Sequence, residues 1–138
     1  MFPREVEQEV FHATNGELGW TRSQIPVVVE VLRSLRMAVI GGELWWVEEG
    51  SRDWIGLIPQ RQGPPAVYPW DTKRGPGESW PDFVERAAAD TLAAVQRWPA
   101  SEDLPMGVRG RILYNLTWAS EDEFECLCSL PQRLKARK

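Results

Sequence analysis

Chemically reactive side chains are scarce in this 138-residue sequence, which has one histidine, His12, and two cysteines, Cys126 and Cys128. A single histidine excludes a histidine-rich metal site. It also weakens any scheme in which histidine activates a serine or cysteine nucleophile. The two cysteines are too close in sequence for an unstrained disulfide, so we expect reduced thiols. No metal or cofactor is expected.

Carboxylates gather at Glu121–Glu125 and at Glu102–Asp103. Two carboxylates in one cleft could hydrolyse a substrate by acid–base catalysis. Both groups stand where helices are expected to begin, and there a negative charge stabilises the helix through its dipole. A two-carboxylate hydrolase is therefore the least favoured functional hypothesis.

Tryptophan is the unusual residue type, with eight in the chain. Trp45 and Trp46 are adjacent in a predicted strand, so their side chains must point to opposite faces of a sheet. One of the two side chains must therefore lie on the face that the helices do not cover. If that face is open to solvent, it presents indole rings together with an arginine and an amide. Such a patch could contact a protein, a sugar or a stacked base. The candidate binding residues are Trp45, Trp46, Trp54, Trp70, Arg111, Asn115 and Thr117. The alternative is a second small core, closed by the proline-rich loop.

Apolar periodicity predicts the helices that would cover the sheet. Residues 23 to about 38 form an amphipathic pattern that begins after Ser23, which places Pro26 in the first turn. Residues 80–98 form the clearest helix, capped by Ser79. A short helix starts at Ser120 and ends near residue 131. Residues 3–13 could be a weak helix or an edge strand.

The strands are predicted from runs of branched and aromatic residues. Residues 43–47 and 54–58 form a hairpin after the Gly41-Gly42 break, with Trp46 opposite Trp54 unless the register slips by one. Residues 66–70 form an edge strand. Residues 109–119 alternate between apolar and more polar side chains, so one face is buried and the other less so. The fold class is α+β, a mainly antiparallel sheet of about four strands with helices on one face.

The composition is that of a single globular domain, residues 1–138, with a frayed basic tail at 132–138. Hydrophobic residues make up 43% of the chain and the net charge is −4, values that exclude a disordered chain.

Mild acidity argues against a duplex nucleic acid partner, and no apolar run is long enough for a membrane helix. The N-terminus does not resemble a signal peptide, and the excess of arginine over lysine indicates GC-rich bacterial coding. We expect a cytoplasmic protein.

In size, composition and shortage of catalytic side chains, the chain resembles the small, acidic, tryptophan-rich α+β immunity proteins of bacterial toxin systems. The resemblance covers the whole chain and is carried by no motif. It implies a non-catalytic module that binds another protein, here through an aromatic sheet face or the acidic helix starts. The alternative is a small-molecule module for a sugar or an anion, with a tryptophan-lined pocket and Arg111 as the anion contact.

Overall fold

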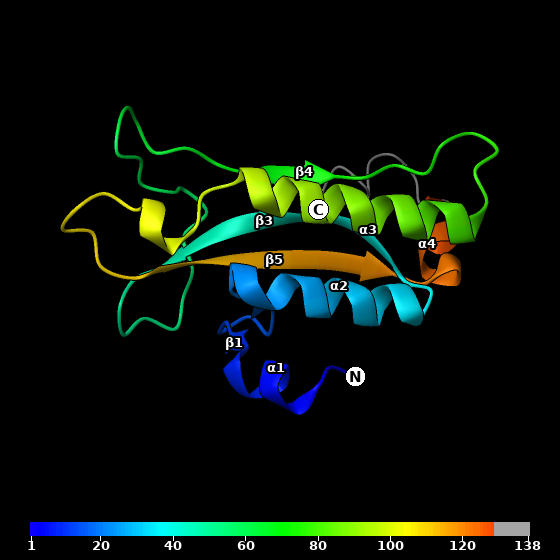
Figure 1. Ribbon diagram of the computed structural model, residues 1–138, viewed down its shortest axis with the longest axis horizontal. Helices are drawn as coiled ribbons and strands as arrows, with labels where there is room; N and C mark the ends of the chain where they lie inside the picture. The colour runs from blue at the N-terminus through cyan, green and yellow to red at the C-terminus, as the bar shows by residue number, and fades with distance from the viewer. Residues whose placement is uncertain (129–138) are drawn as a thin grey trace.

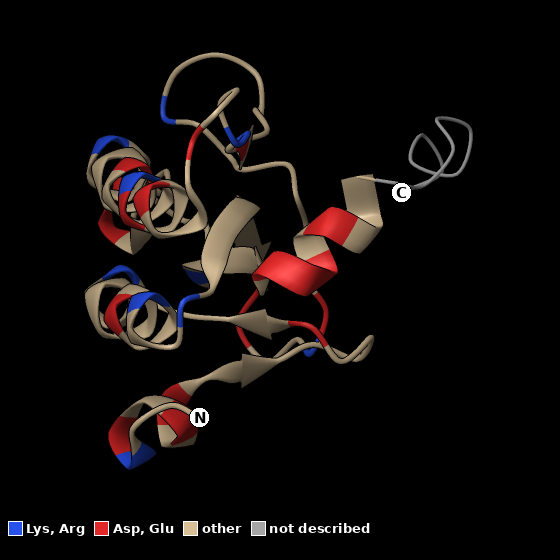
Figure 2. Ribbon diagram, turned by 90° about the vertical axis from the view of Figure 1, so that its right-hand side faces the viewer, with Lys and Arg blue, Asp and Glu red and all other residues tan. Residues whose placement is uncertain are grey.

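A three-stranded antiparallel sheet, in the order β4-β3-β5, lies at the centre of the protein (Figure 1). The computed structural model describes residues 1–128. Figure 2 shows two helices, α2 and α3, side by side on one side of the strands. The elements are α1 (Arg4–Glu9), β1 (Phe11–His12), β2 (Leu18–Gly19), η1 (Arg22–Gln24), α2 (Ile25–Ser34), β3 (Ala38–Val47), β4 (Pro69–Asp71), α3 (Trp80–Arg97), η2 (Ser101–Asp103), β5 (Arg111–Ala119) and α4 (Glu121–Cys128). The α+β class, with helices on one face of an antiparallel sheet, is confirmed.

The sheet has three strands rather than four, because residues 54–58 do not continue the expected hairpin. Only Ile55 pairs with β3, exchanging backbone hydrogen bonds of 2.8 and 2.9 Å with Trp46. The chain then turns away, and Ile58 pairs with Ala66 instead. Trp46 therefore stands opposite Ile55 and not opposite Trp54. This one-residue shift turns the Trp54 side chain to the other face of the sheet.

The boundary between α2 and β3 also differs from the prediction. The helix ends at Ser34 rather than near residue 38, and β3 begins at Ala38 and runs through Gly41 and Gly42. Arg36 ends the helix by adopting a left-handed backbone with φ of 58°. This conformation lets the Met37 N–H bond to the Leu32 carbonyl at 2.9 Å, a common way to satisfy the last carbonyls of a helix.

Arg36→Gly should raise the free energy of unfolding by about 0.5–1 kcal/mol, because glycine adopts a positive φ without the steric cost that Arg36 bears. Urea denaturation followed by circular dichroism measures the change. Arg36→Ala is the control, since it removes the same charge but keeps the Cβ atom and should bring no gain. Equal stability of the two variants would contradict this account of the helix end.

Several sequence predictions are confirmed at the helix starts. The Ser79 hydroxyl accepts a hydrogen bond from the Asp82 N–H at 3.2 Å and caps α3. Ser120 and Glu123 form the expected capping box of α4, with bonds of 2.9 and 3.2 Å. Residues 3–13 contain both a short helix, α1, and a two-residue strand, β1. The predicted end of the last helix near residue 131 and the predicted basic tail lie outside the described residues.

The buried apolar side chains of residues 1–128 form three clusters, of which two involve α3 and one lies on the opposite face of the sheet. The main core lies under α2 and α3 and contains fully buried side chains such as Trp20, Leu32 and Leu44. A smaller core on the opposite face is built on Trp45 and Leu113. As a result β5 has five consecutive buried residues, 112–116, and not the one buried face predicted from its alternation. No helix in the described part of the chain has the length and apolarity to cross a membrane.

Candidate functional site

The face of the sheet opposite α2 and α3 carries five of the seven predicted site residues, four of them in β3 and β5 and the fifth, Trp54, in the loop after β3. In the β3–β5 pair Trp45 stands opposite Leu113, and Leu113 shares its face of β5 with the other odd-numbered residues, among them Arg111, Asn115 and Thr117. Directly opposed residues of antiparallel strands point to the same face. Trp45, Arg111, Asn115 and Thr117 therefore share one face, as the sequence predicted.

Trp45 is covered on that face and has no exposed surface. The Trp54 ring stacks on it at 4.7 Å between centroids and 7° between planes, and Phe11 of β1 packs edge-on at 6.3 Å. The indole N–H of Trp45 donates to Glu43 Oε1 at 3.1 Å. Trp45 is thus the centre of a second small core. That core is closed by β1 and by Trp54 itself, and not by the proline-rich loop.

The remaining two predicted tryptophans lie on the helix face. The Trp70 ring packs edge-on against Trp98, with centroids 4.8 Å apart. Trp46 is half-buried at one end of the main core, and its indole N–H donates to the Arg109 carbonyl at 3.3 Å. The tertiary structure therefore distributes the four predicted tryptophans over both faces, and only Trp45 and Trp54 meet.

The polar residues of β5 divide between two hollows at the ends of the small core. Asn115 is 7% exposed, and its side-chain amide donates to the Leu18 carbonyl at 2.9 Å, which holds β2 against β5. Thr117 is exposed beside a hollow of about 370 Å³ formed by residues 16–18 and 115–118. Arg111 lies at the opposite end of the strand, in a larger hollow.

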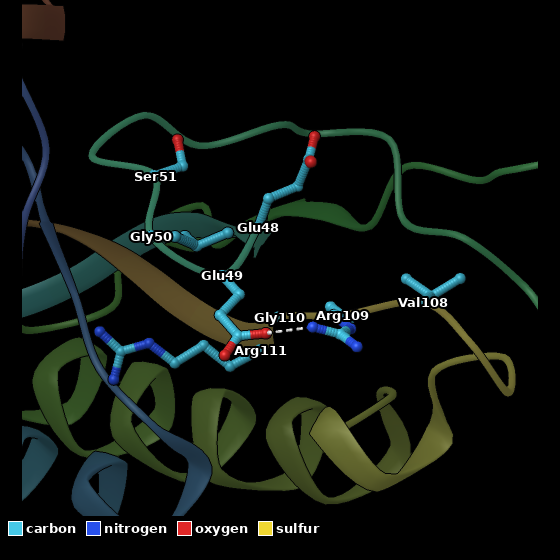
Figure 3. A pocket seen from close by; sticks show the side chains of 9 residues that line it. Glu48, Glu49, Gly50, Ser51, Val108, Arg109, Gly110 and Arg111 are labelled. Carbon is cyan, nitrogen blue, oxygen red and sulfur yellow. Dashed lines mark ion pairs between the residues drawn. The ribbon is translucent and has the colours of Figure 1, made fainter.

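That larger hollow has a volume of about 730 Å³ and lies between residues 47–51 and 108–111 (Figure 3). Arg109 and Glu49 face each other at 3.8 Å across its mouth, and both side chains are largely exposed. The guanidinium of Arg111 points away from this pair and lies 5.8 Å from the centre of the Phe11 ring. Within residues 1–128, Arg111 makes no ion pair.

Gly110 allows the two segments around this hollow to approach closely. Its φ is 128°, and a Cβ atom there would lie 2.3 Å from the Val47 carbonyl oxygen. A side chain at this position would push the strand ends apart. The close approach of Gly110 to the Val47 carbonyl therefore sets the spacing of the two segments that line the hollow.

Exposed apolar side chains gather in the loops at the same end of the molecule. We call residues 48–68 and 104–111 the loop end (Figure 1, left). Of the seven large hydrophobic side chains that are exposed among the described residues, four belong to it: Ile55, Leu57, Val67 and Met106. Met106 is fully exposed. Arg61 joins the two loops by donating to the carbonyls of Glu102 and Leu104, the latter at 3.5 Å.

Met106 and Arg109 were not among the site residues predicted from the sequence. The only available signal was local: Met106 stands between Pro105 and Gly107, where no helix or strand can bury its side chain. An exposed methionine in such a turn is unusual, whereas an isolated arginine is not. Arg109 becomes part of the candidate site only because the two loops approach each other in the folded protein.

Four of the six carboxylates considered for hydrolysis have structural partners. Glu121 and Glu125 pair with Arg74 at 3.3 and 3.0 Å. Asp103 accepts a hydrogen bond from the Ala100 N–H at 2.8 Å, and the Ser120 N–H holds the pKa of Glu123 below its usual value. Among the described residues no group of three His, Cys, Asp or Glu side chains is placed to hold a metal ion.

The chain was compared with protein-family models, with curated proteins and with solved structures, and none of the three comparisons yields a match.

Proposed function

We propose that the protein is a non-catalytic binding module that recognises another protein through the loop end. The observation that carries this proposal is the concentration of exposed apolar side chains there, beside two exposed arginines and the half-buried Trp46. Methionine, tryptophan and arginine are the residue types enriched at protein interfaces. Exposed apolar groups scattered singly need no explanation, but their gathering at one end of a small protein does.

The charges at the loop end define the chemistry of the partner. Glu49 lies close enough to Arg109 to offset its charge, whereas Arg111 has no carboxylate partner among the described residues. A partner that buries Met106 would complement this surface by placing a carboxylate near Arg111. An immunity or inhibitor protein is the most specific form of this proposal, since inhibition requires a preformed surface and no reactive group.

Met106→Asp and Arg111→Ala should each weaken partner binding at least tenfold and change the free energy of unfolding by less than about 0.5 kcal/mol. The matched controls are Val27→Asp, at an exposed position of α2, and Arg4→Ala on α1. A protein captured by the wild type from a lysate is identified by mass spectrometry, and its affinity for all five proteins is measured by calorimetry. Equal affinity of the loop-end variants and the controls would refute the proposal.

The second candidate function is binding of a small anionic ligand in the hollow beside Arg111. Its volume of about 730 Å³ is large enough for a nucleotide or a sugar phosphate. Melting-temperature shifts in a panel of such anions would separate the two functions. A shift that Arg111→Ala abolishes and Met106→Asp preserves would favour the small molecule over the protein partner.

A further inference from the structure

The helix that follows β5, α4 (Glu121–Cys128), lies on the outside of the molecule and contains no buried residue. All eight of its residues are exposed or half-buried, whereas α2 and α3 each bury at least four side chains. It stands at the end of the molecule opposite the loop end (Figure 1, right). α4 therefore covers part of the surface without belonging to the core.

Phe124 packs α4 against two aromatic residues at the start of α3. Its ring centroid lies 5.7 Å from that of Trp80 and 5.4 Å from that of Phe83. Trp80 and Phe83 belong to a cluster of buried apolar side chains that is separate from the main core. Trp80 is 6% exposed and Phe83 has no exposed surface. Removal of α4 would therefore uncover aromatic rings at the end of this cluster.

Arg74 holds α4 by charge and is itself held by the rest of the protein. Its guanidinium pairs with Glu121 at 3.3 Å and with Glu125, one helical turn later, at 3.0 Å. The same group lies 5.5 Å from the centre of the Trp80 ring, and its Nε donates to the Glu78 carbonyl at 2.9 Å. Arg74 would thus keep its place if α4 moved away. We call Arg74, Trp80 and Phe83 the α4 contact surface.

The contacts of α4 are of kinds that exchange readily in water. The Glu121 and Glu125 side chains are 47% and 63% exposed, and ion pairs of such groups contribute little to stability and are screened by salt. A helix of eight residues is not stable in water unless it packs against something. We therefore expect α4 to detach as a unit while the rest of the protein stays folded.

We propose that α4 is a displaceable cover, and that the α4 contact surface binds an acidic helix of another protein in its place. α4 itself shows the chemistry of that helix: a phenylalanine with one carboxylate three residues before it and another directly after it. The phenylalanine would pack on Trp80 and Phe83, and the carboxylates would pair with Arg74. α4 and the partner helix compete for one surface, so α4 acts as an autoinhibitory contact.

The first test measures the detachment of α4 in the full chain by hydrogen exchange, followed by NMR. The amides of residues 125–127 should exchange at least a hundredfold faster than those of residues 87–91 in α3. The double-lysine variant, Glu121→Lys with Glu125→Lys, should accelerate exchange in α4 at least threefold more, because Arg74 then repels the helix. The control makes the same charge change at exposed positions away from α4, Glu5→Lys with Glu48→Lys, and should leave this exchange unchanged.

The second test adds a capped peptide with the sequence of residues 120–128, carrying Cys126→Ser and Cys128→Ser to prevent oxidation. Binding is followed by the NMR signal of the Trp80 indole N–H. The peptide should bind the double-lysine variant at least tenfold more tightly than the wild type, in which the tethered α4 competes at a high effective concentration. A peptide that also carries Phe124→Ala should bind at least tenfold more weakly than the first.

Four results would overturn the proposal. One is exchange of the α4 amides at the rate of those in α3, since the helix would then leave only when the protein unfolds. Another is equal affinity of the peptide for the wild type and the double-lysine variant, because α4 would then not cover the binding surface. Equal binding of the Phe124→Ala peptide would show that the aromatic rings are not the site. A stable dimer of the wild type in ultracentrifugation, lost in the double-lysine variant, would assign the surface to α4 of a second copy.

Discussion

Trp45→Ala should lower the free energy of unfolding by about 3–5 kcal/mol, the largest effect we expect from truncating a single side chain on this face. Trp45 has no exposed surface and is enclosed by the stacked ring of Trp54 and the edge of Phe11. Its removal would leave a cavity in the small core and deprive Glu43 of the indole N–H. Urea denaturation followed by circular dichroism measures the loss. A destabilisation of this size is a large part of the stability of a typical domain.

Trp45→Phe provides the control for this prediction. The phenyl ring keeps an aromatic surface for Trp54 to stack on, so this variant should recover at least half of the lost stability. An alanine variant within about 1 kcal/mol of the wild type would show that the small core contributes little.

Gly42→Ala should cost about 3 kcal/mol or more, because a Cβ atom has no room at this position. It would lie 2.1 Å from the Trp70 ring and 2.3 Å from the Asn115 carbonyl oxygen. The ring could move at some cost, but the carbonyl belongs to β5 and can move only with the strand. Chemical denaturation of the variant measures the cost, and a stability equal to that of the wild type would contradict this arrangement of β3.

Two further variants separate the causes of this effect. Gly56→Ala is the matched control, since the nearest atom to its Cβ would lie at 3.6 Å, and its stability should change by less than about 0.5 kcal/mol. Combining Gly42→Ala with Trp70→Ala removes the clash with the ring but not the clash with the carbonyl. A double-mutant cycle should therefore show a favourable coupling that recovers only part of the loss.

The helices and the long strand could be predicted because their signals are local. The cap at Ser79, the apolar stripe of α3 and the capping box of Ser120 and Glu123 all lie within a few residues of the structure they specify. The alternation in β5 likewise placed Arg111, Asn115 and Thr117 on one face, because side chains in a strand alternate whatever surrounds it.

The boundary between α2 and β3 was predicted wrongly for a physical reason. Residues 35–40 continue the apolar pattern of the helix, and nothing in that pattern distinguishes a helix from a buried strand. The left-handed backbone at Arg36 decides the outcome, although an arginine gives no local signal for it. Gly41 and Gly42 do not interrupt the strand. They leave the room that β4 needs to approach β3 closely.

The sequence by itself determined the α+β class, the caps of α3 and α4 and the side-chain faces of β5, since each follows from signals over short distances in the chain. Only the tertiary structure decided which faces are open. The pairing of Trp46 with Ile55 brings Trp54 onto Trp45, and β1 closes the other side of that ring. Burial depends on segments that are distant in the chain, such as Phe11 and Trp54, and their approach is set by loop lengths and packing that no local pattern encodes.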